Sequence, residues 1–174
     1  MRDVQSAPNG LPPRTPEMLH NIVRKFYRGA VSHYDLIQAK KAEAAAARQE
    51  CRAGGDDAAL KRALHTLFLE FHFYVTCWLK IEQALVRLAS QDGRQAAVLE
   101  RFRPELERHL GVREQLDKTE ACVEAQLAHG GPDWPCVQQD EYWFAGIAFT
   151  VDEYSLQALH DLYEAIQRAR NEVE

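Results

Sequence analysis

Apolar residues recur at helical spacing between positions 60 and 88, and they cover far more than one face of the expected helix. One stripe contains Leu60, Leu64, Leu67, Phe71, Val75, Trp78, Leu85 and Leu88, and a second contains Phe68, Phe73, Cys77, Ile81 and Ala84. A helix that is apolar nearly all round must be buried nearly all round. The pattern therefore predicts a central helix that starts at Asp56 or Asp57 and ends near Ser90.

Two further helices are expected, each with apolar residues on one face. The first should begin at Thr15-Pro16-Glu17, because Thr caps helix starts, Pro suits the first helical position and Glu favours the positive end of the helix dipole. Its apolar face fades after Ile37, and Gly54-Gly55 should end it. Asp152 is the expected cap of the last helix, which carries apolar residues on one face.

A third segment, from Arg94 to about His129, keeps approximate helical spacing of its apolar residues. Pro104 removes a backbone donor and clashes with the preceding turn, so the helix is expected to break or kink there. Gly111 is a second weak point, and Gly130-Gly131-Pro132 is a strong stop signal. The pattern predicts a kinked, charged helix beside the central one.

The stretch from Tyr142 to Val151 is aromatic and β-branched, with Ala145-Gly146 at its centre. It predicts a short β-hairpin with its turn at that pair, and a buried helical segment is the alternative. The fold class is therefore all-α: a bundle of four to five helices with a small β-hairpin inserted before the last helix. Residues 1–15 are expected to form a disordered tail and residues 16–174 a single helical domain.

Composition narrows the class of protein. The 174 residues are 46% apolar and 27% charged, as in an ordinary globular domain, and the net charge of −5 excludes a surface covered in phosphate-binding residues but not a local basic patch. No apolar run reaches the roughly 20 residues of a membrane helix, and no signal peptide is evident, so we expect a cytoplasmic protein without a membrane partner. The widely spaced cysteines lack the pattern of a zinc site.

Polar residues on the central helix are the first candidates for chemistry. His65 and His72 are seven residues apart, so about 10 Å separates them along the helix axis and one metal ion cannot bind both. Glu82 interrupts the apolar stripe, and a buried carboxylate needs a partner, which we expect to be an Arg or Lys of the third segment. We predict no metal and no cofactor. A bundle that binds a small molecule near Glu82, His72 and Tyr74 is one hypothesis.

The third segment is locally basic within an acidic chain, with acidic residues interleaved. A solvated helix face with ion pairs four residues apart, such as Glu114 with Lys118, is the simplest interpretation. The segment also contains Arg113-Glu114-Gln115-Leu116-Asp117-Lys118-Thr119-Glu120. This run, after an aromatic central helix, resembles the Arg-x4–6-His motif of the HEPN superfamily of small bacterial helical proteins. The resemblance extends from Leu60 to Arg168.

In that family the active members are metal-independent ribonucleases, whose motif Arg and His act across a homodimer on the phosphate and the 2′-hydroxyl. Lys118 stands at the position of the His, and lysine is a poor proton shuttle near neutral pH unless its pKa is strongly lowered. A second alignment places the motif at Arg103 and His109, with Pro104 directly after the Arg. The resemblance therefore implies Arg113 with Lys118, or Arg103 with His109, as catalytic candidates if the chain is a ribonuclease.

The preferred hypothesis is a non-catalytic helical interaction protein of HEPN-like type, which forms a homodimer and binds a protein partner near the third segment. Its candidate binding residues are Glu114, Asp117, Glu82 and His72. A toxin-like, HEPN-type ribonuclease is the alternative, and RNA is a partner only under that alternative.

Overall fold

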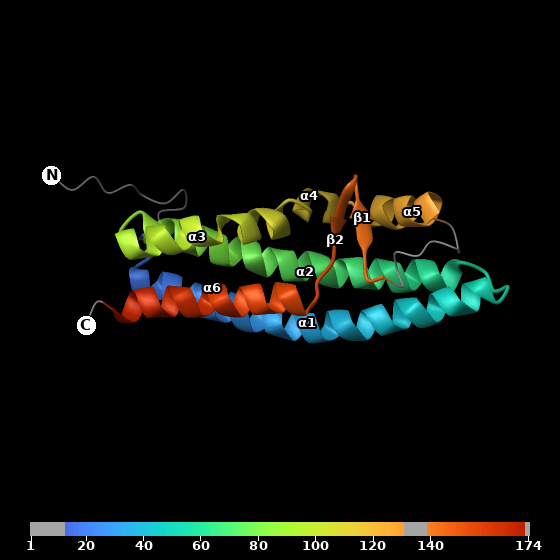
Figure 1. Cartoon of the computed structure of the whole chain (residues 1–174), viewed down its shortest axis with the longest axis horizontal. Coiled ribbons are helices and arrows are strands. Elements are labelled where there is room, and N and C mark those ends of the chain that lie inside the picture. The colour runs from blue at the N-terminus through green and yellow to red at the C-terminus, as the bar shows by residue number, and fades with distance from the viewer. Residues whose placement is uncertain (1–12, 131–138, 173–174) are drawn as a thin grey trace.

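The computed structural model describes residues 13–130 and 139–172, which form an elongated bundle of helices (Figure 1). The helices are α1 (Pro16–Arg52), α2 (Ala58–Ala89), α3 (Gly93–Leu110), the single-turn α4 (Arg113–Leu116), α5 (Thr119–Gly130) and α6 (Glu153–Asn171). Strands β1 (Tyr142–Phe144) and β2 (Ile147–Phe149) precede α6. The predicted fold class, an all-α bundle with a hairpin before the last helix, is confirmed. Most of the predicted tail lies outside the described residues.

Helix α2 is the centre of the bundle. It packs along α1, while α3, α4 and α5 follow one another along another of its sides (Figure 1). The side chains of Phe68, Phe71, Tyr74 and Trp78 are 0% exposed. Burial of each such side chain contributes about 1.5–3 kcal/mol, so the aromatic run of α2 supplies much of the stability of the bundle. No helix within residues 13–130 or 139–172 combines the length and the apolar character needed to cross a membrane.

Side chains fix the starts of the first and last helices, as predicted. The hydroxyl of Thr15 accepts a hydrogen bond from the backbone N–H of Met18 at 3.2 Å, and Pro16 occupies the first position of α1. The carboxylate of Asp152 accepts from the backbone N–H of Ser155 at 2.9 Å. Such a cap contributes about 1 kcal/mol. The second cap also determines where the side chain of Ser155 enters the core.

The turn of the hairpin lies at Ala145-Gly146, where it was predicted, and the helical alternative is excluded. Strands β1 and β2 pair antiparallel, with Tyr142 opposite Phe149. The backbone φ angles are 50° at Ala145 and 85° at Gly146. Positive φ at both central residues is the hallmark of a type I′ turn, the tight turn whose twist matches two paired strands.

The hairpin is attached to the bundle by aromatic packing and by one lysine. Phe149 meets Phe71 of α2 edge-to-face, with ring centroids 5.8 Å apart. The ammonium group of Lys41, on α1, donates to Asp140 Oδ2 at 2.6 Å and to the backbone carbonyl of Val151. Lys41 therefore links α1 to the segments on both sides of the hairpin.

Of the break or kink predicted at Pro104, the break does not occur. Helix α3 continues through this residue, and both Pro104 and Glu100, whose carbonyl loses its helical partner, are exposed. Water can therefore bind that carbonyl, so the proline does not end the helix. The chain breaks at Gly111 instead, where the last backbone bond of α3 runs to Glu107, and the fully buried Val112 then anchors the start of α4.

Candidate functional site

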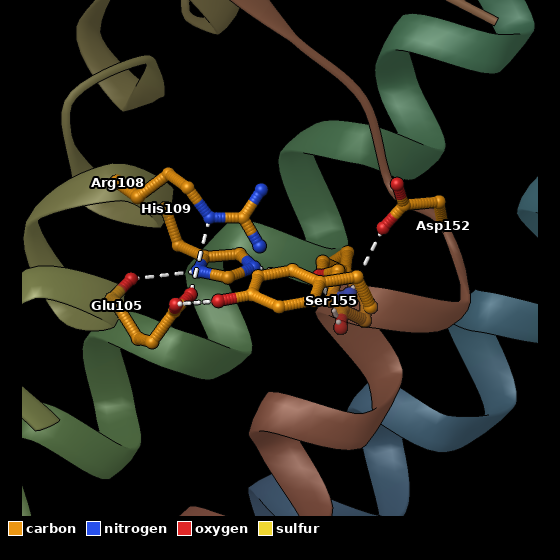
Figure 2. A network of polar contacts seen from close by, with 7 residues as sticks. Glu105, Arg108, His109, Asp152 and Ser155 are labelled. Carbon is orange, nitrogen blue, oxygen red and sulfur yellow. Dashed lines mark hydrogen bonds and ion pairs between the residues drawn. The ribbon is translucent and has the colours of Figure 1, made fainter.

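The C-terminal end of α3 inserts a histidine into the aromatic core. The His109 side chain is 0% exposed and stacks on the indole of Trp78, with ring centroids 3.8 Å apart and planes 10° from parallel. Its Nδ1 lies 2.7 Å from the backbone carbonyl of Glu105, and its Nε2 lies 2.6 Å from the hydroxyl of Ser155. Figure 2 shows this imidazole between Glu105 on α3 and Ser155 on α6. Three helices therefore meet at one ring.

The partners of His109 determine the direction of every hydrogen bond in the group. A backbone carbonyl can only accept, so Nδ1 carries the proton and donates to Glu105. Nε2 of the neutral ring then accepts from the hydroxyl of Ser155. That hydroxyl in turn accepts from Tyr74, whose oxygen lies 2.9 Å away. The resulting chain runs from Tyr74 through Ser155 and His109 to the α3 backbone, with each proton used once.

Burial governs the ionisation of this chain. Together with a smaller effect of the nearby Arg108, it lowers the pKa of His109 to about 3. It also raises the pKa of Tyr74 to about 12. Both groups are therefore neutral near pH 7. A serine beside a histidine also occurs in nucleophilic catalysis, but Ser155 is 0% exposed and its histidine is a very weak base. The arrangement joins helices and offers no substrate a path to either side chain.

A more exposed polar cluster lies above the buried ring. The guanidinium of Arg108 donates to Glu105 Oε2 at 3.1 Å, and the hydroxyl of Tyr154 donates to Glu105 Oε1 at 2.8 Å. Arg108 also lies over the Tyr154 ring, 5.2 Å from its centroid. In Figure 2, the guanidinium of Arg108 lies above the imidazole of His109 in the view. The cluster therefore links the end of α3 to the start of α6.

A cleft of about 440 Å³ opens between this cluster and the hairpin, lined by Arg108, Asp140, Glu141, Phe149, Thr150 and Asp152. The acidic residues of the lining are largely engaged. Asp140 binds Lys41 and the hydroxyl of Thr150, and Asp152 caps α6. Polar side chains already paired with one another favour a structural joint over a ligand site.

The structure separates Arg103 from His109. Six residues on a helix correspond to about 600° of rotation, which places the two side chains on different faces. Arg103 is exposed and paired with Glu100, whereas His109 is buried against Trp78. In this conformation the two side chains cannot contact one substrate group within a single chain.

The residues of the first alignment lie at the surface around α4. Arg113 is half-buried, and Glu114 and Lys118 are exposed. Asp117 Oδ1 lies 3.0 Å from His72 Nε2, so this pair ties α2 to the end of α4. An open cleft of about 400 Å³ is lined by residues 117–121. The structure thus brings His72 and Asp117 together, which the sequence did not predict.

The prediction that Glu82 is a buried carboxylate paired with an Arg or Lys of the third segment is wrong. The side chain is half-buried, and it forms no ion pair with any residue in the described ranges. Since water reaches the carboxylate, it needs no cationic partner. Tyr74 binds Ser155 inside the core while His72 binds Asp117 at its edge, so the two side chains do not share a partner. Within the described residues, no group of three or more His, Cys, Asp or Glu could hold a metal ion.

Sequence reasoning missed the role of Ser155. Its only local signal is its position three residues after the capping Asp152, in the first turn of a helix.

No protein-family model, no curated protein and no solved structure matches the chain. Comparison with known proteins therefore neither supports nor contradicts the HEPN-like resemblance.

Proposed function

We propose that the chain is a non-catalytic binding protein of HEPN-like type that acts as a homodimer. The burial of His109 carries the proposal. This residue is the histidine that the Arg103 alignment needs, and its two ring nitrogens are bound to Glu105 and Ser155. The other alignment has Lys118 in place of histidine, which is ill suited to move a proton near neutral pH.

The surface around α4 supports binding in place of catalysis. Arg113, Glu114 and Lys118 form no ion pair with another described residue. Leu116, between them, is 0% exposed and anchors the turn to the core. A rigid turn with unpaired charges of both signs suits a partner with complementary charges. In a two-fold dimer the same patch can meet its own copy, because the patch carries both signs.

An RNA-cleavage assay tests the absence of catalysis. A labelled single-stranded RNA is incubated with the wild type and with Arg113→Ala/Lys118→Ala, both with a chelator present. We expect neither protein to cleave RNA above the buffer control. Cleavage by the wild type that disappears in the double variant would overturn the proposal and establish the ribonuclease alternative.

Light scattering after size-exclusion chromatography tests the homodimer. The chain has a mass of 19.9 kDa, and we expect twice this mass for the wild type. Arg113→Glu/Lys118→Glu should shift the protein toward the monomer. The control Arg168→Glu, at an exposed position of α6, should not change the mass. A monomeric wild type contradicts the homodimer, and a dimer insensitive to the double variant places its interface elsewhere.

A further inference from the structure

A second surface feature lies far from α4. A groove of about 260 Å³ runs between the first half of α1 and the last part of α2. Arg14 and Lys25 line it on the α1 side, and Lys80 and Arg87 line it on the α2 side. The apolar part of the lining, called its floor below, consists of Ile22 and Phe26 of α1 and Ala84 of α2. The groove therefore combines cations from both sides with an apolar floor.

Among residues 13–130 and 139–172, no acidic side chain lines this groove, although the chain has a net charge of −5. The two acidic residues nearest in sequence to the lining residues lie on other surfaces. Glu17 lines a neighbouring cavity with His20 and Arg170. Glu82 lies toward α3, where it adds to the effect of Glu100 in raising the pKa of Arg103.

The positive charge of the groove is also uncompensated. Within the described ranges, Arg14, Lys25, Lys80 and Arg87 form no ion pair, whereas most cations of α3 are paired with acids. Four such charges around a concave surface raise the local concentration of anions more strongly than the same charges on a flat face. The groove is therefore suited to a ligand with more than one negative charge.

The spacing of the cations and the apolar floor of the groove indicate which kind of anion it fits. Lys80 and Arg87 are seven residues apart, which puts them on one face of α2 with about 10 Å between them along the axis. Two phosphates of one extended strand can pair with long, flexible side chains arranged in this way. The half-buried ring of Phe26 provides an apolar surface for a base, as aromatic residues do in proteins that bind single strands.

We propose that this groove binds single-stranded nucleic acid, with phosphates on its two cationic walls and a base against Phe26. Its concave shape does not fit a flat lipid surface. Its short apolar floor is too small for the face of a peptide helix. The site is separate from residues 113–120, and the inference does not rest on the proposed function.

Fluorescence anisotropy with a short labelled single-stranded RNA tests the proposal, in the presence of a chelator. Lys80→Glu/Arg87→Glu is expected to weaken binding by about tenfold or more at moderate salt. Loss of two phosphate contacts should also reduce the slope of log affinity against log salt by about 1.4. The matched control is Arg52→Glu/Arg62→Glu, which changes the net charge equally at two exposed positions outside the groove and should alter the affinity by less than about twofold.

Several outcomes would overturn the proposal. Failure of the wild type to bind the RNA is one, and an equal loss of RNA affinity in the two double variants is another. An unlabelled mononucleotide that competes as well as the unlabelled oligonucleotide would also overturn it. Anionic vesicles that bind while the RNA does not would assign the groove to lipid. Far-ultraviolet circular dichroism of each variant verifies the fold, and Lys80→Gln/Arg87→Gln should show an intermediate loss because it removes charge without reversing it. The RNA-cleavage assay measures catalysis and the anisotropy assay measures binding in the groove. A failure of the proposed function can therefore be told from a failure of this inference.

Discussion

The imidazole of His109 lies flat against the indole of Trp78, with ring centroids 3.8 Å apart. A polar ring in an aromatic core is favourable only when its nitrogens are bonded, and here the Glu105 carbonyl and the Ser155 hydroxyl provide both partners. The histidine thus acts as a packing residue with two fixed hydrogen bonds.

Replacement of His109 by alanine should destabilise the protein strongly. The change leaves a cavity against Trp78 and removes the partner of Ser155, so we expect a loss of about 3 kcal/mol in the free energy of unfolding. Urea denaturation followed by circular dichroism measures it. His65→Ala, at an exposed position of α2, is the control and should change stability by less than about 0.5 kcal/mol. Equal effects of the two changes would contradict the packing role.

The stability should depend on pH through the same residue. The pKa of His109 is about 3 in the folded protein, against an ordinary value of 6.5. Between these values the unfolded chain binds a proton that the folded chain does not, so the free energy of unfolding falls as the pH decreases from 6.5 toward 3. The slope reaches about 1.4 kcal/mol per pH unit, and His109 adds no dependence above this window.

A comparison with His109→Gln separates this effect from the titration of carboxylates. The variant should be less stable than the wild type at pH 7, and the difference should shrink as the pH falls, because glutamine does not titrate. Denaturant midpoints across the acidic range measure the difference. A constant difference between the two proteins would show that His109 titrates normally.

Ser155 should contribute more than Tyr74 to the hydrogen-bonded chain. Ser155→Ala leaves both His109 and Tyr74 without a partner, which should lower the free energy of unfolding by about 2 kcal/mol. Tyr74→Phe removes one terminal donor, at about 1 kcal/mol. The double variant should cost less than the sum, because Phe has no hydroxyl left unpaired. Additive effects in a denaturation cycle would show that the two hydroxyls are not coupled.

The features that sequence predicted best depend on local or periodic information. The caps at Thr15 and Asp152 and the turn at Ala145-Gly146 need only a few adjacent residues, and the central helix needs only its apolar period. The same reasoning placed Phe73 in the buried stripe, yet its side chain is 43% exposed. An apolar period shows that a helix is mostly buried, but it does not show where the neighbouring helices stop.

The candidate site was less predictable because its contacts join distant segments. His109 and Ser155 are 46 positions apart, and neither residue type nor spacing indicates that they meet. The break predicted at Pro104 is absent for a related reason, since tolerance of proline depends on which face of α3 meets water. The HEPN-like assignment remains a prediction.

Replacement of Ala145 by asparagine should stabilise the hairpin. Ala145 has a φ of 50°, a region that asparagine adopts more readily than alanine. We expect a gain of about 0.5–1 kcal/mol in the free energy of unfolding, measured by thermal or chemical denaturation. Ala148→Asn, at an exposed position of β2, is the control and should not stabilise. A loss of stability at position 145 would argue against the type I′ turn.

Replacement of Lys41 by methionine should loosen the hairpin. The change keeps most of the aliphatic stem but removes the bonds to Asp140 and to the Val151 carbonyl, which we expect to cost about 1–2 kcal/mol. Faster amide hydrogen exchange over residues 142–149 is the measurement. Lys40→Met removes only a surface ion pair with Glu43 and should leave exchange unchanged. If both variants exchange alike, Lys41 does not hold the hairpin.

The hydrogen bonds from Gln38 and Lys41 to the Val151 carbonyl divide α1 into two parts. Before this point α1 also packs against α6. Beyond it the alanine-rich end of α1 continues toward the turn at Gly54 beside the start of α2, on which α5 also packs. Segments with few packed neighbours open at lower free energy than the rest of a domain. The end of α1 after Lys41 and the start of α2 should therefore unfold and refold together as a separate cooperative unit, while the aromatic core stays folded.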